Sequence, residues 1–170
     1  MGIRQQLRSA PVVGIGGSRA PGAASFRALG QVLLLIPSGV PVYVGCAAGI
    51  DAAVRRARPG ARVFRASSSR PGALAARSIR CVRAVAQAGG LWLSFPGRAC
   101  PAGIRPASYG SACFSGGGSG SWASLALAAG LGRACLVFLP NSIQPPAPFG
   151  LQTLGRGWFW RAGRGQLRLL

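Results

Sequence analysis

The sequence has no lysine, glutamate or histidine, and Asp51 is its only acidic residue. General acid–base catalysis usually relies on such side chains, so the candidates are reduced to Asp51 and the two tyrosines. A lone carboxylate cannot form the carboxylate pair of a glycosidase or of a two-carboxylate metal site. Serine or cysteine nucleophiles would lack a neighbouring base. We therefore predict no catalytic residue, and the sequence disfavours enzymatic activity without excluding it.

Metal-binding and membrane-spanning features are equally scarce. The five cysteines are scattered and form no C-x-x-C pair, so without histidine a zinc site is not expected. We interpret them as reduced, mostly buried thiols of a cytoplasmic protein that needs no cofactor. Residues 1–10 do not resemble a signal peptide, and the longest aliphatic run, 32–36, is far too short to span a membrane.

Positive charge is what the chain has in excess. All 20 basic residues are arginine, which gives a formal net charge of +19. Such a field attracts polyanions, with nucleic acid as the first candidate and an anionic membrane surface as the second. Arginine also suits bidentate contacts to phosphate and stacking on bases. A biased codon composition would explain the same residue usage equally well, but the positive field exists whichever origin is right.

The length and the alternation of apolar segments predict one Rossmann-like α/β domain, with a mostly parallel sheet and helices on both faces. It covers residues 11–140, after a basic lead-in at 1–10 that we expect to be frayed. Residues 141–170 form a proline-rich connection and then an aromatic, arginine-rich tail that suits a hairpin over a sheet edge. Within the domain we predict strands at 11–16, 41–45, 61–65, 91–95 and 134–139, helices at 23–36, 49–58, 73–88 and 120–131, and a long loop at 96–115.

Two glycine-rich segments lie where such folds bind ligands, near the carboxyl ends of strands. The first is GIGGSR (14–19), and the second is GGGSGS (116–121), which opens the fourth predicted helix. Backbone N–H groups and the helix dipole suit such a junction to an anion such as phosphate. For the first segment a plain tight turn is the alternative. It is not followed by the acidic residue of a dinucleotide motif, so a dinucleotide cofactor is disfavoured.

Three further positions carry open alternatives. Asp51 follows the second predicted strand, where it suits a helix cap or a contact to an arginine, a sugar hydroxyl or a base edge. Arg77 and Arg80 belong to a stripe of arginines on the third helix, which is either a phosphate track or a solvated face. Trp122 is expected in the core rather than stacked on a base.

Four segments together resemble the Rossmann-like core of the DprA/Smf family, whose members bind single-stranded DNA and load a recombinase. The resemblance implies a cleft that binds a single strand, and self-association as a homodimer. The wider set that shares this core includes the lonely-guy (LOG) nucleotide phosphoribohydrolases, whose catalytic glutamate has no counterpart here. The segments are VVGIGGSR (12–19), VYVGCAAGID (42–51), ARSIRCVRAVAQAGGLWLSF (76–95) and GSGSWASLALAAGLGRACLVFLP (118–140).

The resemblance also assigns roles residue by residue. The family's Gly-Ser-Arg turn, which contacts DNA phosphates, and its Gly-x-Ala-Arg-Gly-Ile-Asp, Arg-Asn and Ser-Gly-Ser motifs all have counterparts here. Two positions depart from the family pattern. Ala48 replaces the arginine of the Gly-x-Ala-Arg-Gly-Ile-Asp motif, and Cys81 replaces the asparagine of the Arg-Asn motif. Together with neighbouring residues of the same loops and helix, the predicted phosphate-binding set is Gly16, Gly17, Ser18, Arg19, Gly45, Gly49, Asp51, Arg77, Arg80, Ser119, Gly120 and Ser121.

These observations predict a nucleic-acid-binding protein that holds single-stranded DNA or RNA by its backbone phosphates. One alternative is a small-nucleotide sensor or a LOG-like nucleotide enzyme, in which the same loops hold one phosphate. Another is a basic structural component that binds RNA within a larger particle. The residues do not distinguish DNA from RNA, because a contact to a 2′-hydroxyl leaves no pattern in the sequence.

Overall fold

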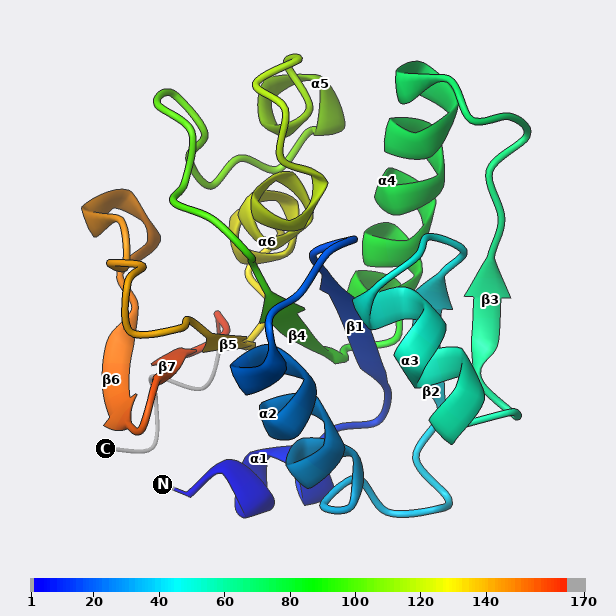
Figure 1. Cartoon of the computed structure of the whole chain (residues 1–170), viewed down its shortest axis with the longest axis vertical. Helices are drawn as coiled ribbons and strands as arrows, with labels where there is room; N and C mark the ends of the chain where they lie inside the picture. Colours follow the sequence, from blue (N-terminus) through cyan, green and yellow to red (C-terminus); the bar gives the residue numbers. More distant parts are fainter. Residues whose placement is uncertain (1, 165–170) are drawn as a thin grey trace.

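One twisted sheet runs through the middle of the molecule, with helices on both of its faces (Figure 1). The computed structural model describes residues 2–164, and within them the strand order is β3-β2-β1-β4-β5-β7-β6. The first five strands in this order are parallel, whereas β7 pairs antiparallel with β5 and β6 pairs antiparallel with β7. The strands are β1 (Val13–Gly17), β2 (Val42–Gly45), β3 (Arg62–Phe64), β4 (Leu91–Phe95), β5 (Cys135–Phe138), β6 (Gln152–Gly155) and β7 (Trp158–Arg161).

The helices divide between the two faces and enclose two apolar clusters. Leu7, Leu29 and Val54 represent the cluster under α1, α2 and α3, and Val82 and Leu125 the cluster under α4 and α6. Among the described residues, no helix combines the length and the apolar character needed to cross a bilayer. The helices are α1 (Ile3–Ser9), α2 (Ala23–Leu33), α3 (Ile50–Ala57), α4 (Pro71–Gln87), α5 (Gly110–Cys113), α6 (Gly120–Gly130) and the short 3-10 helix η1 (Ala147–Phe149).

This architecture confirms the predicted fold class, a Rossmann-like α/β domain with a mostly parallel sheet. The predicted tail hairpin is also present, because β7 pairs with the outer edge of β5 and β6 pairs with β7. Two local expectations were wrong. The lead-in forms helix α1 and buries Leu7 completely, because apolar side chains one turn apart can face the sheet. The 96–115 segment is not entirely loop, since it contains α5.

The glycines of β1 are explained by packing rather than by a turn. Gly14 pairs with Trp92 of β4, and the indole lies across β1 so closely that a Cβ at Gly14 or Gly16 would overlap it. On the opposite face, a Cβ at Gly17 would collide with Ile50 and Phe95. The first glycine-rich segment is therefore mostly strand, and only its last residues form the loop that leaves the sheet.

Candidate anion-binding pocket

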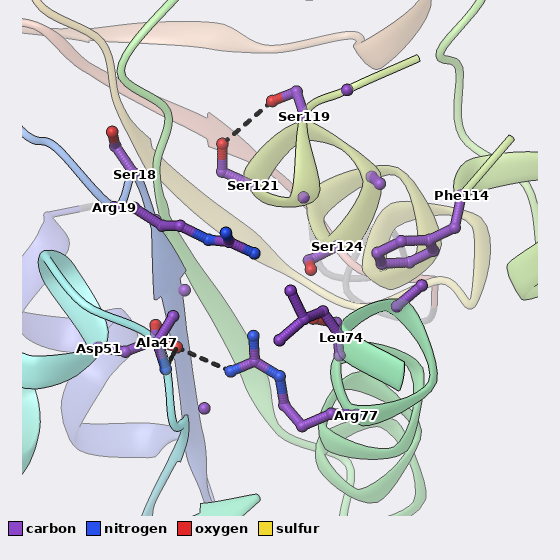
Figure 2. Close-up of a pocket in the computed structure, with 18 of the residues that line it drawn as sticks. Ser18, Arg19, Ala47, Asp51, Leu74, Arg77, Phe114, Ser119, Ser121 and Ser124 are labelled. Carbon is purple, nitrogen blue, oxygen red and sulfur yellow. Dashed lines mark hydrogen bonds and ion pairs between the residues drawn. The ribbon is translucent and has the colours of Figure 1, made fainter. Parts of the chain in front are cut away.

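A cavity of about 920 Å³ opens at the carboxyl ends of β1, β2 and β4, between α4 and α6. Both glycine-rich segments line it, the first through residues 15–19 and the second through residues 116–121. The two segments predicted to converge at one edge of the sheet therefore do so. We call this cavity the pocket, and Figure 2 shows its labelled side chains.

The turn after β1 is held rigidly against two neighbouring segments. The Ser18 N–H donates to the Phe95 carbonyl at 2.9 Å, and the Ile50 N–H donates to the Ser18 carbonyl at 3.0 Å. Gly49 has a φ of +71°, and a Cβ there would collide with the backbone of Ser18 and Arg19. Gly49 therefore does not line the pocket itself but allows the loop after β2 to support the turn that does.

The loop before α6 provides the second wall. Gly116 and Gly118 have positive φ values, and Ser119 occupies the cap position without a side-chain capping bond. The first N–H groups of a helix have no partner inside it, so those of α6 remain available at the pocket. The Ser119 and Ser121 hydroxyl oxygens lie 3.3 Å apart beside them. This end of α6 thus offers backbone and hydroxyl donors together with the positive end of the helix dipole.

Trp122, the next residue of α6, is part of the core and not a stacking platform. It is fully buried, its ring meets Phe149 edge-on at 5.3 Å between centroids, and its indole N–H donates to the Arg98 carbonyl at 2.8 Å. The predicted core position is confirmed. The same hydrogen bond also fixes the backbone of Arg98, whose side chain is exposed and lines the pocket.

A buried ion pair forms the floor of the pocket. Arg77 Nη1 lies 2.9 Å from Asp51 Oδ2, and the two residues are only 6% and 5% exposed. The Ala47 N–H donates to the same carboxylate oxygen at 3.2 Å. Of the alternatives for Asp51, the structure selects the contact to an arginine, at the first turn of α3.

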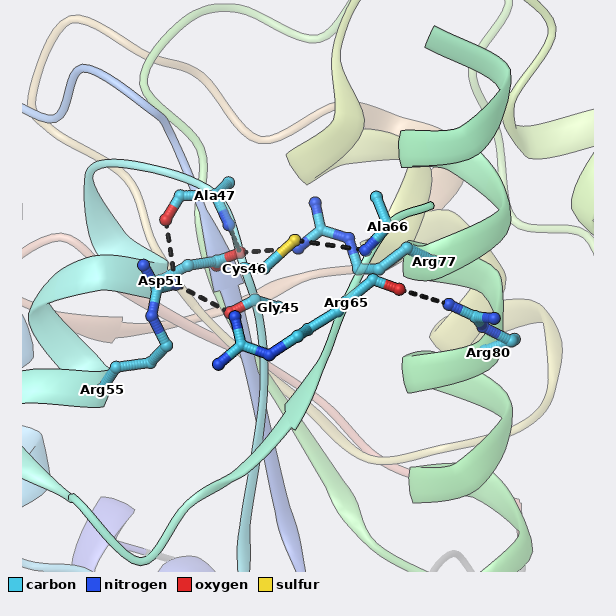
Figure 3. Close-up of polar contacts among 9 residues, drawn as sticks. All are labelled: Gly45, Cys46, Ala47, Asp51, Arg55, Arg65, Ala66, Arg77 and Arg80. Atoms are coloured by element: carbon cyan, nitrogen blue, oxygen red, sulfur yellow. Dashed lines mark hydrogen bonds and ion pairs between the residues drawn. The ribbon is translucent and has the colours of Figure 1, made fainter. Parts of the chain in front are cut away.

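The electrostatics of this pair are set by burial and by arginine. Burial raises the pKa of Asp51, and this effect is opposed by the Arg77 guanidinium, the Ala47 N–H and the more distant charge of Arg55. Arg55 does not bond the carboxylate but donates to the Gly45 and Ala47 carbonyls, each at 2.9 Å, and so secures the loop after β2 (Figure 3). Arg77 and Arg55 together leave the surroundings of Asp51 positively charged.

Two buried donors in the pocket lining have no partner among the described residues, Arg77 Nε and Trp92 Nε1. Arg19 and Arg98 also line the pocket, as exposed side chains without an ion-pair partner in residues 2–164. The inner surface is therefore rich in hydrogen-bond donors, and its one carboxylate is already engaged. A ligand that supplies acceptor oxygens and negative charge fits this donor set.

The structure brings ten of the twelve predicted residues together in the lining and leaves two, Gly49 and Arg80, outside it. Arg80 points away from the pocket, where it donates to the Arg65 carbonyl at 2.6 Å (Figure 3). Sequence reasoning missed Arg98, Ser69 and Ser124, which also line the pocket. The sequence could have indicated Arg98 as a pocket residue, because it closely follows the carboxyl end of β4. The predicted residues found in the lining are Gly16, Gly17, Ser18, Arg19, Gly45, Asp51, Arg77, Ser119, Gly120 and Ser121.

In residues 2–164 no three Cys or Asp side chains gather in a way that could hold a metal ion. Comparison with protein-family models, with curated proteins and with solved structures finds no match for this chain. The functional interpretation therefore depends on the geometry and charge of the pocket.

Proposed function

We propose that this protein binds single-stranded nucleic acid, DNA or RNA, by placing backbone phosphates in the pocket. The observation that carries the proposal is the donor-rich lining, in which Arg19, Arg77 and Arg98 converge with the N-terminus of α6. Phosphate oxygens accept hydrogen bonds from guanidinium and backbone N–H groups alike. No other carboxylate in the sequence competes with a bound phosphate, because Asp51 is the only one.

The charge of the whole molecule supports the same ligand. The net charge of +19 is what remains after Asp51 offsets one of the 20 arginines, so the protein attracts polyanions. Arginines outside the pocket add affinity that is independent of sequence and falls as salt rises. A strand lying across the pocket would gain both the specific contacts inside it and the general attraction around it.

A single strand fits the site better than a duplex does. The donors lie inside a concave pocket, and a flexible strand can lower individual phosphates toward them, whereas a rigid duplex presents its phosphates on a convex surface. The sequence resemblance to the DprA/Smf family supports the same reading and makes a homodimer part of the proposal. Recombinase loading is not part of it, since nothing in the described residues bears on that activity.

Fluorescence anisotropy with labelled single-stranded DNA, single-stranded RNA and duplex DNA, titrated across salt, tests the proposal. We expect a preference for single strands that survives moderate salt and falls about tenfold in Arg19→Ala, since hydrogen bonds from charged groups are the strong ones. Arg8→Ala is the matched control, because Arg8 is exposed on α1 and lies outside the pocket lining. Equal binding to all three ligands, lost together as salt rises, would contradict the proposal.

The second candidate function is binding of a free mononucleotide. The observation that favours it is the cavity itself, because about 920 Å³ lies within the usual size range of small-ligand pockets. Saturable binding of a mononucleotide that persists at high salt would support this function, since a polyelectrolyte contact weakens steeply with salt.

A further inference from the structure

Arg77 is unlike the other arginines that line the pocket, because it is buried and held in place before any ligand arrives. Its side chain is only 7% exposed, and its Nε has no hydrogen-bond partner among residues 2–164. This Nε is itself closed off from solvent, so the unpaired donor costs free energy, and a ligand would meet the outward nitrogen of the guanidinium instead. Figure 2 shows the guanidinium at the base of the pocket, with one nitrogen bonded to Asp51 and another directed into the open space.

The surroundings of Arg77 keep its guanidinium there. Asp51 bonds Nη1 from one side, and on another side the guanidinium lies against Gly45, where a Cβ would overlap Nη1. A glycine at the end of β2 is therefore what makes room for the charged group. This arrangement is preorganised, so little conformational entropy is lost when Arg77 binds a ligand.

A second guanidinium shares the same space. Arg19 extends across the pocket between Ser121 and Ser124 on one side and Arg77 on the other (Figure 2). Within residues 2–164 no carboxylate pairs with Arg19, because Asp51 lies beside Arg77 and is already bonded to it (Figure 2). An anion between Arg19 and Arg77, close to the first turn of α6, would relieve their repulsion.

Because Arg77 lies at the floor of the pocket, it is easier to reach for a terminal phosphate group than for a phosphate within a strand. A phosphodiester within a strand has a nucleoside on each side and only two free oxygens, so it reaches donors at the rim more easily than a guanidinium at the floor. A phosphomonoester at a strand end has three free oxygens and a charge of about −1.5 to −2 at neutral pH. It can enter the pocket and contact the floor and the wall together.

We propose that the pocket binds the terminal phosphomonoester of a nucleic-acid strand, held between Arg77, Arg19 and the N-terminus of α6, while the rest of the strand leaves across the rim. This inference rests on the proposed function and narrows it from a phosphate-binding cleft to the recognition of a strand end. The same chemistry is present in a free mononucleotide, so the experiment includes both sources.

The test measures the affinity of the full chain for one short oligonucleotide in three forms, with a 5′-phosphate, with a 3′-phosphate and with hydroxyl groups at both ends. Adenosine monophosphate and inorganic phosphate serve as competitors. We expect one phosphorylated form to bind about tenfold more tightly than the hydroxyl form, which corresponds to one charged hydrogen bond gained or more. The preferred end identifies which terminus enters the pocket.

Two variants show whether the advantage of the phosphorylated end arises in the pocket. Arg19→Ala removes the exposed guanidinium without touching the buried pair, and Arg77→Lys keeps a positive charge for Asp51 but loses the fork of donors. We expect both to reduce the advantage to about threefold or less, while Arg8→Ala retains it. Circular dichroism shows whether each variant is folded. If Arg77→Lys is unfolded, Arg19→Ala alone tests whether the advantage of the phosphorylated end arises in the pocket.

The outcomes separate the two proposals. Equal affinity for all three oligonucleotides, with binding still sensitive to Arg19→Ala, overturns the recognition of a strand end and leaves the proposed function standing. An advantage that persists unchanged in Arg19→Ala also overturns it, because the phosphate then binds elsewhere. Binding of adenosine monophosphate or inorganic phosphate in the pocket, without measurable binding of any oligonucleotide, refutes both proposals in favour of a small-ligand site.

Discussion

Breaking the buried Asp51–Arg77 pair is the sharpest test of how the pocket is built. Asp51→Asn keeps the size of the side chain and removes the charge that compensates Arg77, which is 6% exposed. Removing one partner of a buried pair typically costs about 3–5 kcal/mol, because the remaining charge stays buried without compensation. A domain is stable by only about 5–15 kcal/mol, so this variant should lose a large part of its free energy of unfolding.

The assay is urea denaturation followed by circular dichroism, with the double variant Asp51→Leu/Arg77→Met as the matched control. Replacing both charges by apolar groups of similar size is often nearly neutral, so the double variant should be more stable than Asp51→Asn. Inorganic phosphate should partly restore Asp51→Asn, because an anion in the pocket can take the place of the carboxylate beside Arg77. A loss below about 1 kcal/mol in Asp51→Asn would refute the reasoning, since the pair would then not hold the guanidinium at the floor.

Two further predictions concern the core on the α4–α6 face of the sheet. Gly14→Ala should lower the free energy of unfolding by about 1–3 kcal/mol, because its Cβ would overlap Trp92. Gly30→Ala, at an open position in helix α2, should raise the free energy of unfolding by about 0.5–1 kcal/mol. A calorimetric comparison in which both variants shift in the same direction would contradict this. Burial raises the pKa of Cys81 and of Cys135 to about 12, against 9.0 for an ordinary thiol, so the unfolded chain loses these protons first. The free energy of unfolding should therefore fall as the pH rises from about 9 towards 12, and urea denaturation of a Cys81→Ala/Cys135→Ala variant should show a shallower fall.

The order of elements was predictable from the sequence because glycine and proline mark nearly every boundary. Pro37 and Gly39 follow the second helix, and Gly89 and Gly90 follow α4, so the alternation of strand and helix can be followed directly. Once that alternation is known, parallel strands bring their carboxyl ends to one edge. The convergence of the two glycine-rich segments followed from this rule alone.

The roles of several residues depend on tertiary contacts that the sequence does not reveal. Gly14 and Gly16 suggested a phosphate turn, yet they are required by the indole of Trp92, which comes from a strand far away in the sequence. Arg77 and Arg80 are one helical turn apart and belong to the same predicted stripe, but only Arg77 meets Asp51. Helical spacing relates residues on one helix and says nothing about what lies opposite.

Because Asp51 is the only acidic residue, most arginines need partners other than carboxylates. Several donate to backbone carbonyl groups in place of carboxylates: Arg58 bonds the Ile36 and Pro37 carbonyls after α2, and Arg161 bonds the Phe149 carbonyl. These side chains stabilise helix ends and the segments after them as a capping residue would.

Biased codon usage accounts for arginines that are exposed or that bond the backbone, because either position is easily filled by a long cationic side chain. It does not account for Arg77. A guanidinium that is 6% exposed must be compensated, and the one acidic residue of the sequence lies 2.9 Å from it. Gly45 leaves room for the same group, so three positions from β2, α3 and α4 together maintain one charge at the floor of the pocket. Random accumulation of arginine does not explain why the sole acidic side chain lies there, and this arrangement is the strongest support for the proposal that the pocket binds an anion.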